Sequence, residues 1–150
     1  MKRRSVVITL PSDWHEVEGA CPRAYRRRGS SSGILQISLK PPLDVPISSG
    51  EQALARLNEL LIELGPLGKQ LASGHDECAA GFMAFALHKH DKHGLIALWF
   101  IPGEVTVFAT WQMGSTATAA IERSEAHEIM RQVRFEDSDP AEPFLDEPDG

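Results

Sequence analysis

The sequence is poor in cysteine and has no long apolar run. Its two cysteines, Cys21 and Cys78, are too few for a disulfide framework and predict reduced thiols. No stretch approaches the roughly 20 apolar residues of a membrane-spanning helix. The basic start MKRR precedes an apolar run shorter than the about 7–15 residues that a signal peptide needs. We therefore expect a cytoplasmic protein with no membrane partner.

Motifs that hold nucleotides or activate a nucleophile are also missing. There is no glycine-rich P-loop and no nucleophile elbow. His75 stands three residues before Cys78, which allows a nucleophile–base or a metal-binding interpretation. A catalytic dyad depends on geometry and not on adjacency in the chain, so we interpret the stretch GHDEC as a loop. The sequence thus predicts no catalytic residues, no cofactor and no enzymatic activity.

Basic residues are absent from the end of the chain. Residues 136–150 contain seven acidic residues, three prolines and no lysine or arginine. Such a composition cannot bury enough apolar surface to fold, which predicts a disordered tail. The remaining residues, 1–135, carry 15 basic and 14 acidic side chains and have the length of a single domain.

One basic cluster stands out in this near-neutral body, the stretch RAYRRR at residues 23–28. Arginines so placed could bind a nucleic-acid backbone. The body nevertheless lacks the broad positive field expected of a nucleic-acid-binding domain. Arginines also protect an exposed edge strand against unwanted pairing. We therefore predict an edge strand here and no nucleic-acid partner.

About six segments have the alternating, β-branched or apolar composition of strands. Three precede the first predicted helix, and three follow it as a meander. They cover residues 5–10, 24–28, 34–39, 79–89, 95–101 and 104–112. The first connection of the meander places Asp91 and Gly94 where a type I turn closed by a left-handed glycine requires them. The second connection, Pro102-Gly103, is typical of a type II turn.

Two helices are expected beside these strands. Ser48 followed by Glu51 is a capping-box pattern, and the leucines after it recur at three- and four-residue steps. Gly65 followed by Pro66 is a typical helix end. The second helix is predicted over residues 124–133, with Ser124 as its cap.

The predicted turns set the register of the meander. They place His88 opposite Leu98, His90 opposite Ile96, and Leu98 opposite Val107. One face then carries Phe82, Ala84, Ala86, His88, Ile96, Leu98, Phe100, Val105, Val107 and Trp111. The other carries Met83, Phe85, Leu87, Ala97, Trp99, Ile101, Phe108 and Thr110. Because both faces are apolar, either helices cover both, which we favour, or one face meets a partner or a second copy.

The first turn contains the most chemical stretch of the chain, HKHDKHG at residues 88–94. His88 and His90 project to one side of a strand, a known zinc-ligand spacing, and His93 or Asp91 could add a third ligand. The turn itself accounts for Asp91 and Gly94, and two neighbouring lysines oppose a bound dication. We favour a polar hairpin tip and keep a metal site at these histidines as the alternative.

The order of elements resembles the PsbP-like fold family. The stretches that carry the resemblance are LPSDW (10–14), GILQIS (33–38), VFATWQ (107–112) and EAHEIMRQVRF (125–135). The resemblance implies an α/β/α sandwich and a non-enzymatic binding role, with no shared catalytic residues to carry over. Some bacterial proteins of this kind are similar to immunity proteins, which neutralise a partner toxin.

These observations predict a small α+β protein whose antiparallel sheet of about six strands is packed with helices. We expect it to bind another protein, as an immunity-type inhibitor if the resemblance extends to function. A homo-oligomer is the remaining option for an apolar sheet face. The alternative function is a metal- or small-ligand-binding protein that uses His88, His90 and His93.

Overall fold

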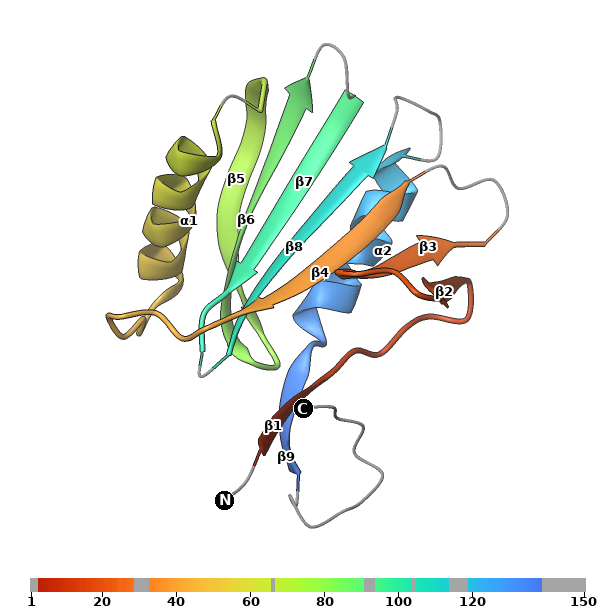
Figure 1. Cartoon of the computed structure of the whole chain (residues 1–150). Helices are drawn as coiled ribbons and strands as arrows, with labels where there is room; N and C mark the ends of the chain where they lie inside the picture. The colour runs from red at the N-terminus through yellow and green to blue at the C-terminus, as the bar shows by residue number, and fades with distance from the viewer. Residues whose placement is uncertain are drawn as a thin grey trace.

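The computed structural model describes residues 3–28, 33–65, 67–90, 94–103, 105–113 and 119–138. Within these ranges the chain forms two helices and nine strands (Figure 1). The helices are α1 (Gly50–Leu64) and α2 (Ala119–Arg131). The strands are β1 (Arg3–Val7), β2 (Trp14–Val17), β3 (Arg23–Arg27), β4 (Ile34–Lys40), β5 (Lys69–Cys78), β6 (Gly81–His90), β7 (Gly94–Ile101), β8 (Thr106–Met113) and β9 (Arg134–Ser138).

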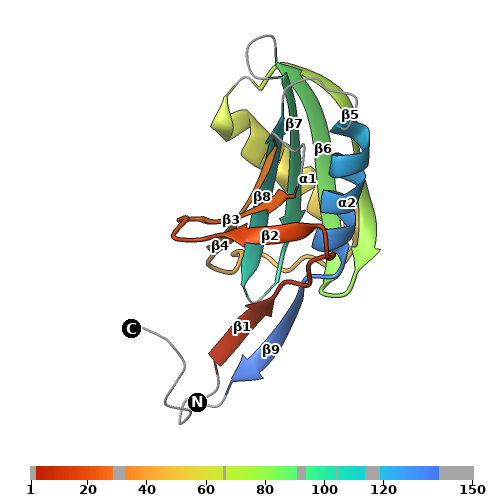
Figure 2. The same cartoon turned by 90° about the vertical axis from the view of Figure 1, so that its right-hand side faces the viewer.

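Seven strands form one antiparallel sheet in the order β2-β3-β4-β8-β7-β6-β5. The remaining two, β1 and β9, pair with each other in a separate ribbon at one end of the molecule (Figures 1 and 2). The described residues thus contain more strands than the six expected, because β2, β5 and β9 were not predicted. Their sequences are short or polar, and pairing holds each of them in place: β2 pairs with β3, β5 with β6, and β9 with the distant β1.

Two of these strands change earlier expectations. The stretch predicted as a loop, GHDEC, lies inside β5, the ten-residue edge strand next to β6. Strand β9 includes the first three residues of the segment predicted to be disordered, since Glu136 pairs with Ser5 and the ladder continues to Ser138. Residues 139–150 lie outside the described residues, so the tail beyond β9 stays a prediction.

The hairpin of β6 and β7 keeps the predicted faces but not the predicted partners. His88 lies opposite Ile96, not Leu98, a shift of two residues that leaves every side chain on its expected face. Gly94 has a φ of 74°, the left-handed conformation that the turn prediction requires. Residues 91–93 at the tip lie outside the described residues.

Strand β8 is turned over relative to the prediction. Leu98 lies opposite Thr110, not Val107, and a shift by an odd number of residues exchanges the two faces of a strand. Val107 and Trp111 therefore pack in the core that contains α2, and Phe108 packs on the α1 side. The cause is the connection, which is longer than a two-residue turn because Ile101 pairs with Val107.

Helix α1 begins one residue later than predicted. Its cap is Ser49, whose Oγ accepts a hydrogen bond from the Gln52 backbone N–H at 3.2 Å. The Gln52 side chain in turn accepts from the backbone N–H of Ser48 at 2.7 Å, so two donors at the helix start are satisfied. Gly65 ends the helix with a φ of 89°. No helix among the described residues is both long enough and apolar enough to cross a membrane.

The two helices pack against opposite faces of the seven-stranded sheet (Figure 2). Helix α1 lies over β5, β6 and β7, where its leucines meet Ala84, Leu98 and Phe100. Helix α2 starts five residues before the predicted cap Ser124, which is an exposed residue inside the helix. It covers the larger core, which holds the three tryptophans, including one from the edge strand β2.

Candidate functional site: a groove beside α1

An open groove of about 540 Å³ lies between the second half of α1 and the ends of β4, β7 and β8. It exists because α1 covers β5–β7 and leaves part of the same face uncovered over β8 and β4 (Figure 1). Most of its lining side chains are apolar. The apolar ones are Pro41, Leu43, Leu60, Leu64, Phe100 and Phe108. The polar ones are Ser38, Lys40, Glu63 and Thr106.

The helix wall of this groove is incompletely covered. Leu64 belongs to the leucine stripe of α1, yet its side chain is 55% exposed at the last turn of the helix. Lys40 and Glu63 are exposed at the strand side and the helix side, and neither has an ion pair within the described residues. The groove therefore combines an apolar floor with one uncommitted positive and one uncommitted negative charge.

The groove continues into a second, smaller hollow. Leu43 lines both, and the second hollow, of about 230 Å³, also contacts Val45, Ile47 and Pro102. Val45 is 58% exposed. Contiguous exposed apolar surface on a folded domain is typical of a site where another molecule binds.

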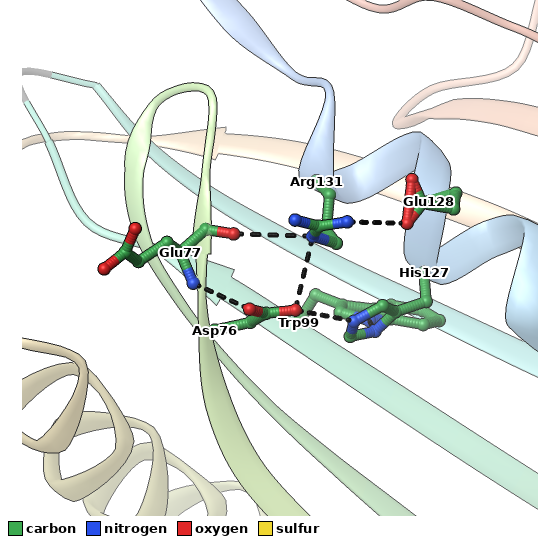
Figure 3. A network of polar contacts seen from close by, with 6 residues as sticks. All are labelled: Asp76, Glu77, Trp99, His127, Glu128 and Arg131. Atoms are coloured by element: carbon green, nitrogen blue, oxygen red, sulfur yellow. Dashed lines mark hydrogen bonds and ion pairs between the residues drawn. The ribbon is translucent and has the colours of Figure 1, made fainter.

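On the other side of the sheet, polar side chains connect α2 to β5 and β7 (Figure 3). The Trp99 indole N–H donates to His127 Nδ1 at 3.0 Å, and His127 Nε2 lies 3.5 Å from an oxygen of Asp76. The same Asp76 oxygen lies 3.2 Å from Arg131 Nε, and Arg131 also binds Glu128 at 2.8 Å. These groups satisfy one another, which is the arrangement of a structural network.

The other two tryptophans are anchored to α2 in the same way. Trp14 donates its indole N–H to Glu125 at 2.9 Å, and Trp111 donates to the buried Glu122 at 3.1 Å. Glu125 also accepts from Arg27 at 2.8 Å. All three indoles in the chain thus bind polar side chains of one helix. Sequence reasoning missed these partners because a glutamate or histidine on a helix gives no signal of which strand it faces.

The predicted metal ligands are brought together only in part. His88 is buried on the α1 face, with Nε2 3.4 Å from the Gln70 amide nitrogen, and its Nδ1 has no hydrogen-bond partner among the described residues. His90 is half-buried two residues further along the same strand. His93 lies outside the described residues, and the part of the chain that the structure describes contains no group of three metal-ligating side chains.

The pair His75 and Cys78 does not converge. Both lie on β5, and an odd separation along a strand points side chains to opposite faces. Burial raises the pKa of the Cys78 thiol, an effect that backbone hydrogen bonds from Ala80 and Gly81 oppose. Raising the pKa removes nucleophilic thiolate. Cys21 is exposed, and both cysteines are free thiols.

The basic cluster occupies an interior strand, which corrects the prediction of an edge strand. Strand β3 lies between β2 and β4. Arg27 binds Glu125 at 2.8 Å, and Arg23 binds Glu16 at 3.3 Å while its guanidinium lies 5.8 Å from the centre of the Tyr25 ring. These partners could not be predicted from the sequence, because they lie on β2 and α2 and only the fold brings them to the arginines. Two of the cluster's arginines are therefore used within the fold.

Comparison with known proteins identifies the fold. No family model and no curated protein sequence matches the chain. The solved structures of a point mutant of Mog1 and of the Ran-binding protein Mog1p from Saccharomyces cerevisiae are similar, with TM-scores of 0.55 and 0.54 and identities of 14% and 12%. Each comparison covers 89% of this chain and 95% of the other. LpqN, involved in cell envelope biogenesis of Mycobacterium tuberculosis, has a TM-score of 0.50 at 10% identity, over 89% of this chain and 84% of LpqN.

These similarities are similarities of fold. They are consistent with the PsbP-like fold that the sequence resembles, and the α+β class with a mostly antiparallel sheet is confirmed.

Proposed function

We propose that this chain is a protein-binding module that seats an apolar segment of a partner protein in the groove beside α1. The observation that carries the proposal is the groove itself, an uncovered apolar surface at the junction of a helix and a sheet. Phe100 is already buried, so the main gain in free energy would come from covering Leu64 and the part of Phe108 that is still exposed, at about 25 cal/mol per Å² of apolar area removed from water.

The charges at the groove define the partner more closely. Lys40 on the strand side favours an acidic residue, and Glu63 on the helix side favours a basic one. The partner segment would therefore present two or more apolar side chains between charges of opposite sign. Such charges set the orientation of the segment more than its affinity.

Two further observations support a non-enzymatic binding role. The polar side chains that converge on α2 bind one another, and the Cys78 thiol has a raised pKa. One structural neighbour is a Ran-binding protein, which supports protein binding as a use of this fold.

The groove is tested with one disruptive and one matched variant on the same helix. Leu64→Glu places a charge in the groove, whereas Ile62→Glu places the same charge on a side chain that is 80% exposed and does not line it. A partner captured by the tagged chain is purified. Its affinity for the unmodified chain and for each of the two variants is then measured by calorimetry. We expect Leu64→Glu to weaken binding at least about tenfold, or ~1.4 kcal/mol, with Ile62→Glu unchanged. Equal affinities for all three proteins would exclude the groove as the binding site.

The narrower forms of this function are part of the proposal. An immunity-type inhibitor would neutralise a toxin in a 1:1 complex, so its test is whether the captured partner loses its own activity on binding. The cytoplasmic location and the homo-oligomer also stay predictions, and sedimentation of the purified chain tests the latter.

A further inference from the structure

Another hollow, separate from the groove beside α1 and from its extension at Val45, lies on the α2 face of the sheet. It has a volume of about 290 Å³ and is enclosed by α2 on one side and by β5, β6 and β7 beneath. Ala72, Leu87 and Ala97 lie opposite one another across the three strands and make a shallow floor of mostly small side chains. Phe85 and Trp99, the next pair along β6 and β7, form an aromatic wall.

The polar side of the hollow comes from α2. Arg123, Ser124 and His127 line it, and no acidic side chain among the described residues does. The two ring nitrogens of His127 already face Trp99 and Asp76. This leaves the Arg123 guanidinium and the Ser124 hydroxyl as the groups available to a ligand.

Arg123 differs from the other charged side chains of α2 because it has no polar partner among the described residues. The others all bind a partner within the fold: Glu122 binds Trp111, Glu125 binds Trp14 and Arg27, Glu128 binds Arg131, and Arg131 binds Asp76. Arg123 has no hydrogen bond or ion pair within the described residues, although its side chain is half-buried at the hollow. A partly desolvated guanidinium without a counter-charge attracts an anion.

We propose that this hollow binds a small aromatic carboxylate, with its ring against the half-buried Phe85, beside the small exposed part of Trp99, and its carboxylate on Arg123. Aromatic walls favour a planar apolar body through offset or edge-to-face contacts. A guanidinium binds a carboxylate through two parallel hydrogen bonds, and Ser124 adds a third donor. The volume is just below the roughly 300–1,000 Å³ typical of ligand pockets, which suits a molecule of one ring. The same chemistry occurs in free aromatic acids and at a peptide C-terminus with an aromatic last residue.

The test uses the three indole N–H groups as reporters in a ¹⁵N-labelled full chain. Phenylacetate is titrated while the assigned indole resonances are followed by nuclear magnetic resonance. Trp99 lines the hollow, whereas Trp14 and Trp111 do not. We expect a saturable shift of the Trp99 resonance alone. Neutral phenylacetamide, which has the same ring and no charge, should bind at least about tenfold more weakly, because it cannot form a charge-assisted hydrogen bond with Arg123.

Variants show whether the proposed contacts carry the binding. Arg123→Gln should lower the affinity for phenylacetate about tenfold or more. Arg26→Gln, at an exposed arginine of β3 that lies away from the hollow, is the matched control and should change nothing. Ala72→Leu fills the hollow from an exposed position on the edge strand, so it should block binding without disturbing the core.

Three results would overturn the proposal: an unmoved Trp99 resonance, equal affinity for phenylacetamide, or an Arg123→Gln variant that binds as the unmodified chain does. N-acetylphenylalanine identifies the source of the ligand, because tighter binding than phenylacetate indicates a peptide C-terminus and weaker binding indicates a free acid. The groove beside α1 lies on the opposite face of the sheet, so its partner assay with Leu64→Glu gives an independent result.

Discussion

The indole nitrogen of Trp99 lies 3.0 Å from Nδ1 of His127. An indole N–H can only donate, so Nδ1 must accept, and the proton of the neutral ring is on Nε2. Nε2 faces Asp76 at 3.5 Å, where an N–H can donate to the carboxylate. The ring of His127 also meets Phe85 edge-on at a centroid distance of 5.0 Å. This relationship fixes the tautomer of the histidine and the position of the middle of α2 over the sheet.

We expect His127→Ala to destabilise the protein because Trp99 is 2% exposed and its N–H would lose its only acceptor among the described residues. Leaving a buried donor unpaired costs about 1–3 kcal/mol. His127→Gln offers a carbonyl oxygen at a similar distance and should recover part of that loss. Urea denaturation measures both free energies of unfolding, and equal losses in the two variants would contradict this role for the hydrogen bond.

Glu125 accepts from two donors, the Trp14 indole at 2.9 Å and Arg27 at 2.8 Å. We expect Glu125→Ala to lower the free energy of unfolding by about 1–3 kcal/mol, because the buried Trp14 N–H is left without a partner. Glu128→Ala, on an exposed face of the same helix, is the control and should change little. If thermal melting shows equal losses for both variants, the Trp14 anchor does not contribute to stability.

Gly50 is required at the start of α1 by a close approach to β5. A Cβ at this position would lie 2.3 Å from His75 Nδ1 and 3.1 Å from His75 Cβ. We expect Gly50→Ala to destabilise the protein by about 1–3 kcal/mol, the usual cost of overpacking, although alanine is the better helix former. Adding His75→Ala should restore the loss, and a double-mutant cycle measures this coupling. Additive effects would contradict the contact.

Tyr25 predicts a loss of stability at alkaline pH. Burial raises its pKa above the ordinary value of 10.0, Arg23 opposes the rise and Glu16 adds to it. The native state therefore holds the phenol proton more tightly than the unfolded state, so the stabilisation is complete below pH 10 and is lost as the pH rises through the native pKa. The Tyr25 hydroxyl has no hydrogen-bond partner among the described residues, so Tyr25→Phe should cost little at neutral pH.

Urea denaturation of the unmodified chain and of Tyr25→Phe, near pH 8 and above about pH 10, checks this prediction. The fall in the free energy of unfolding between the two conditions should be smaller in the variant. An identical fall in both proteins would show that other groups cause the alkaline loss.

The surroundings of the histidines in the β6–β7 hairpin allow a prediction of the zinc content of the protein. His88 is 7% exposed, and its Nε2 lies beside Gln70, so little of its ring is open to an ion. We expect protein purified without a polyhistidine tag to contain far less than one zinc per chain, as measured by mass spectrometry of the metal. A His88→Ala/His90→Ala variant should have the same content. One zinc per chain in the unmodified protein, lost in the variant, would establish the alternative function with His88 or His90 as a ligand.

Local patterns in the sequence were sufficient for some elements and not for others. The leucine spacing located the start of α1 to within one residue, and the apolar runs between turn residues located β6 and β7. Strand β5 was missed because KQLASGHDEC has no apolar alternation, and hydrogen bonds to β6 make it a strand. The groove could not be predicted either, since it depends on how far α1 extends across the sheet.

The sequence by itself determined the class of the protein, the two amphipathic helices and the apolar character of both sheet faces. Only the tertiary structure decided which face each residue of β8 occupies and which polar groups of α2 receive the three indoles. The physical reason is the range of the interactions. Helix periodicity and strand alternation are set by neighbours in the chain, whereas the register of β8 depends on its long connection and on pairing with β4. The acceptors of the indoles lie on α2, between 11 residues away for Trp111 and 111 residues away for Trp14.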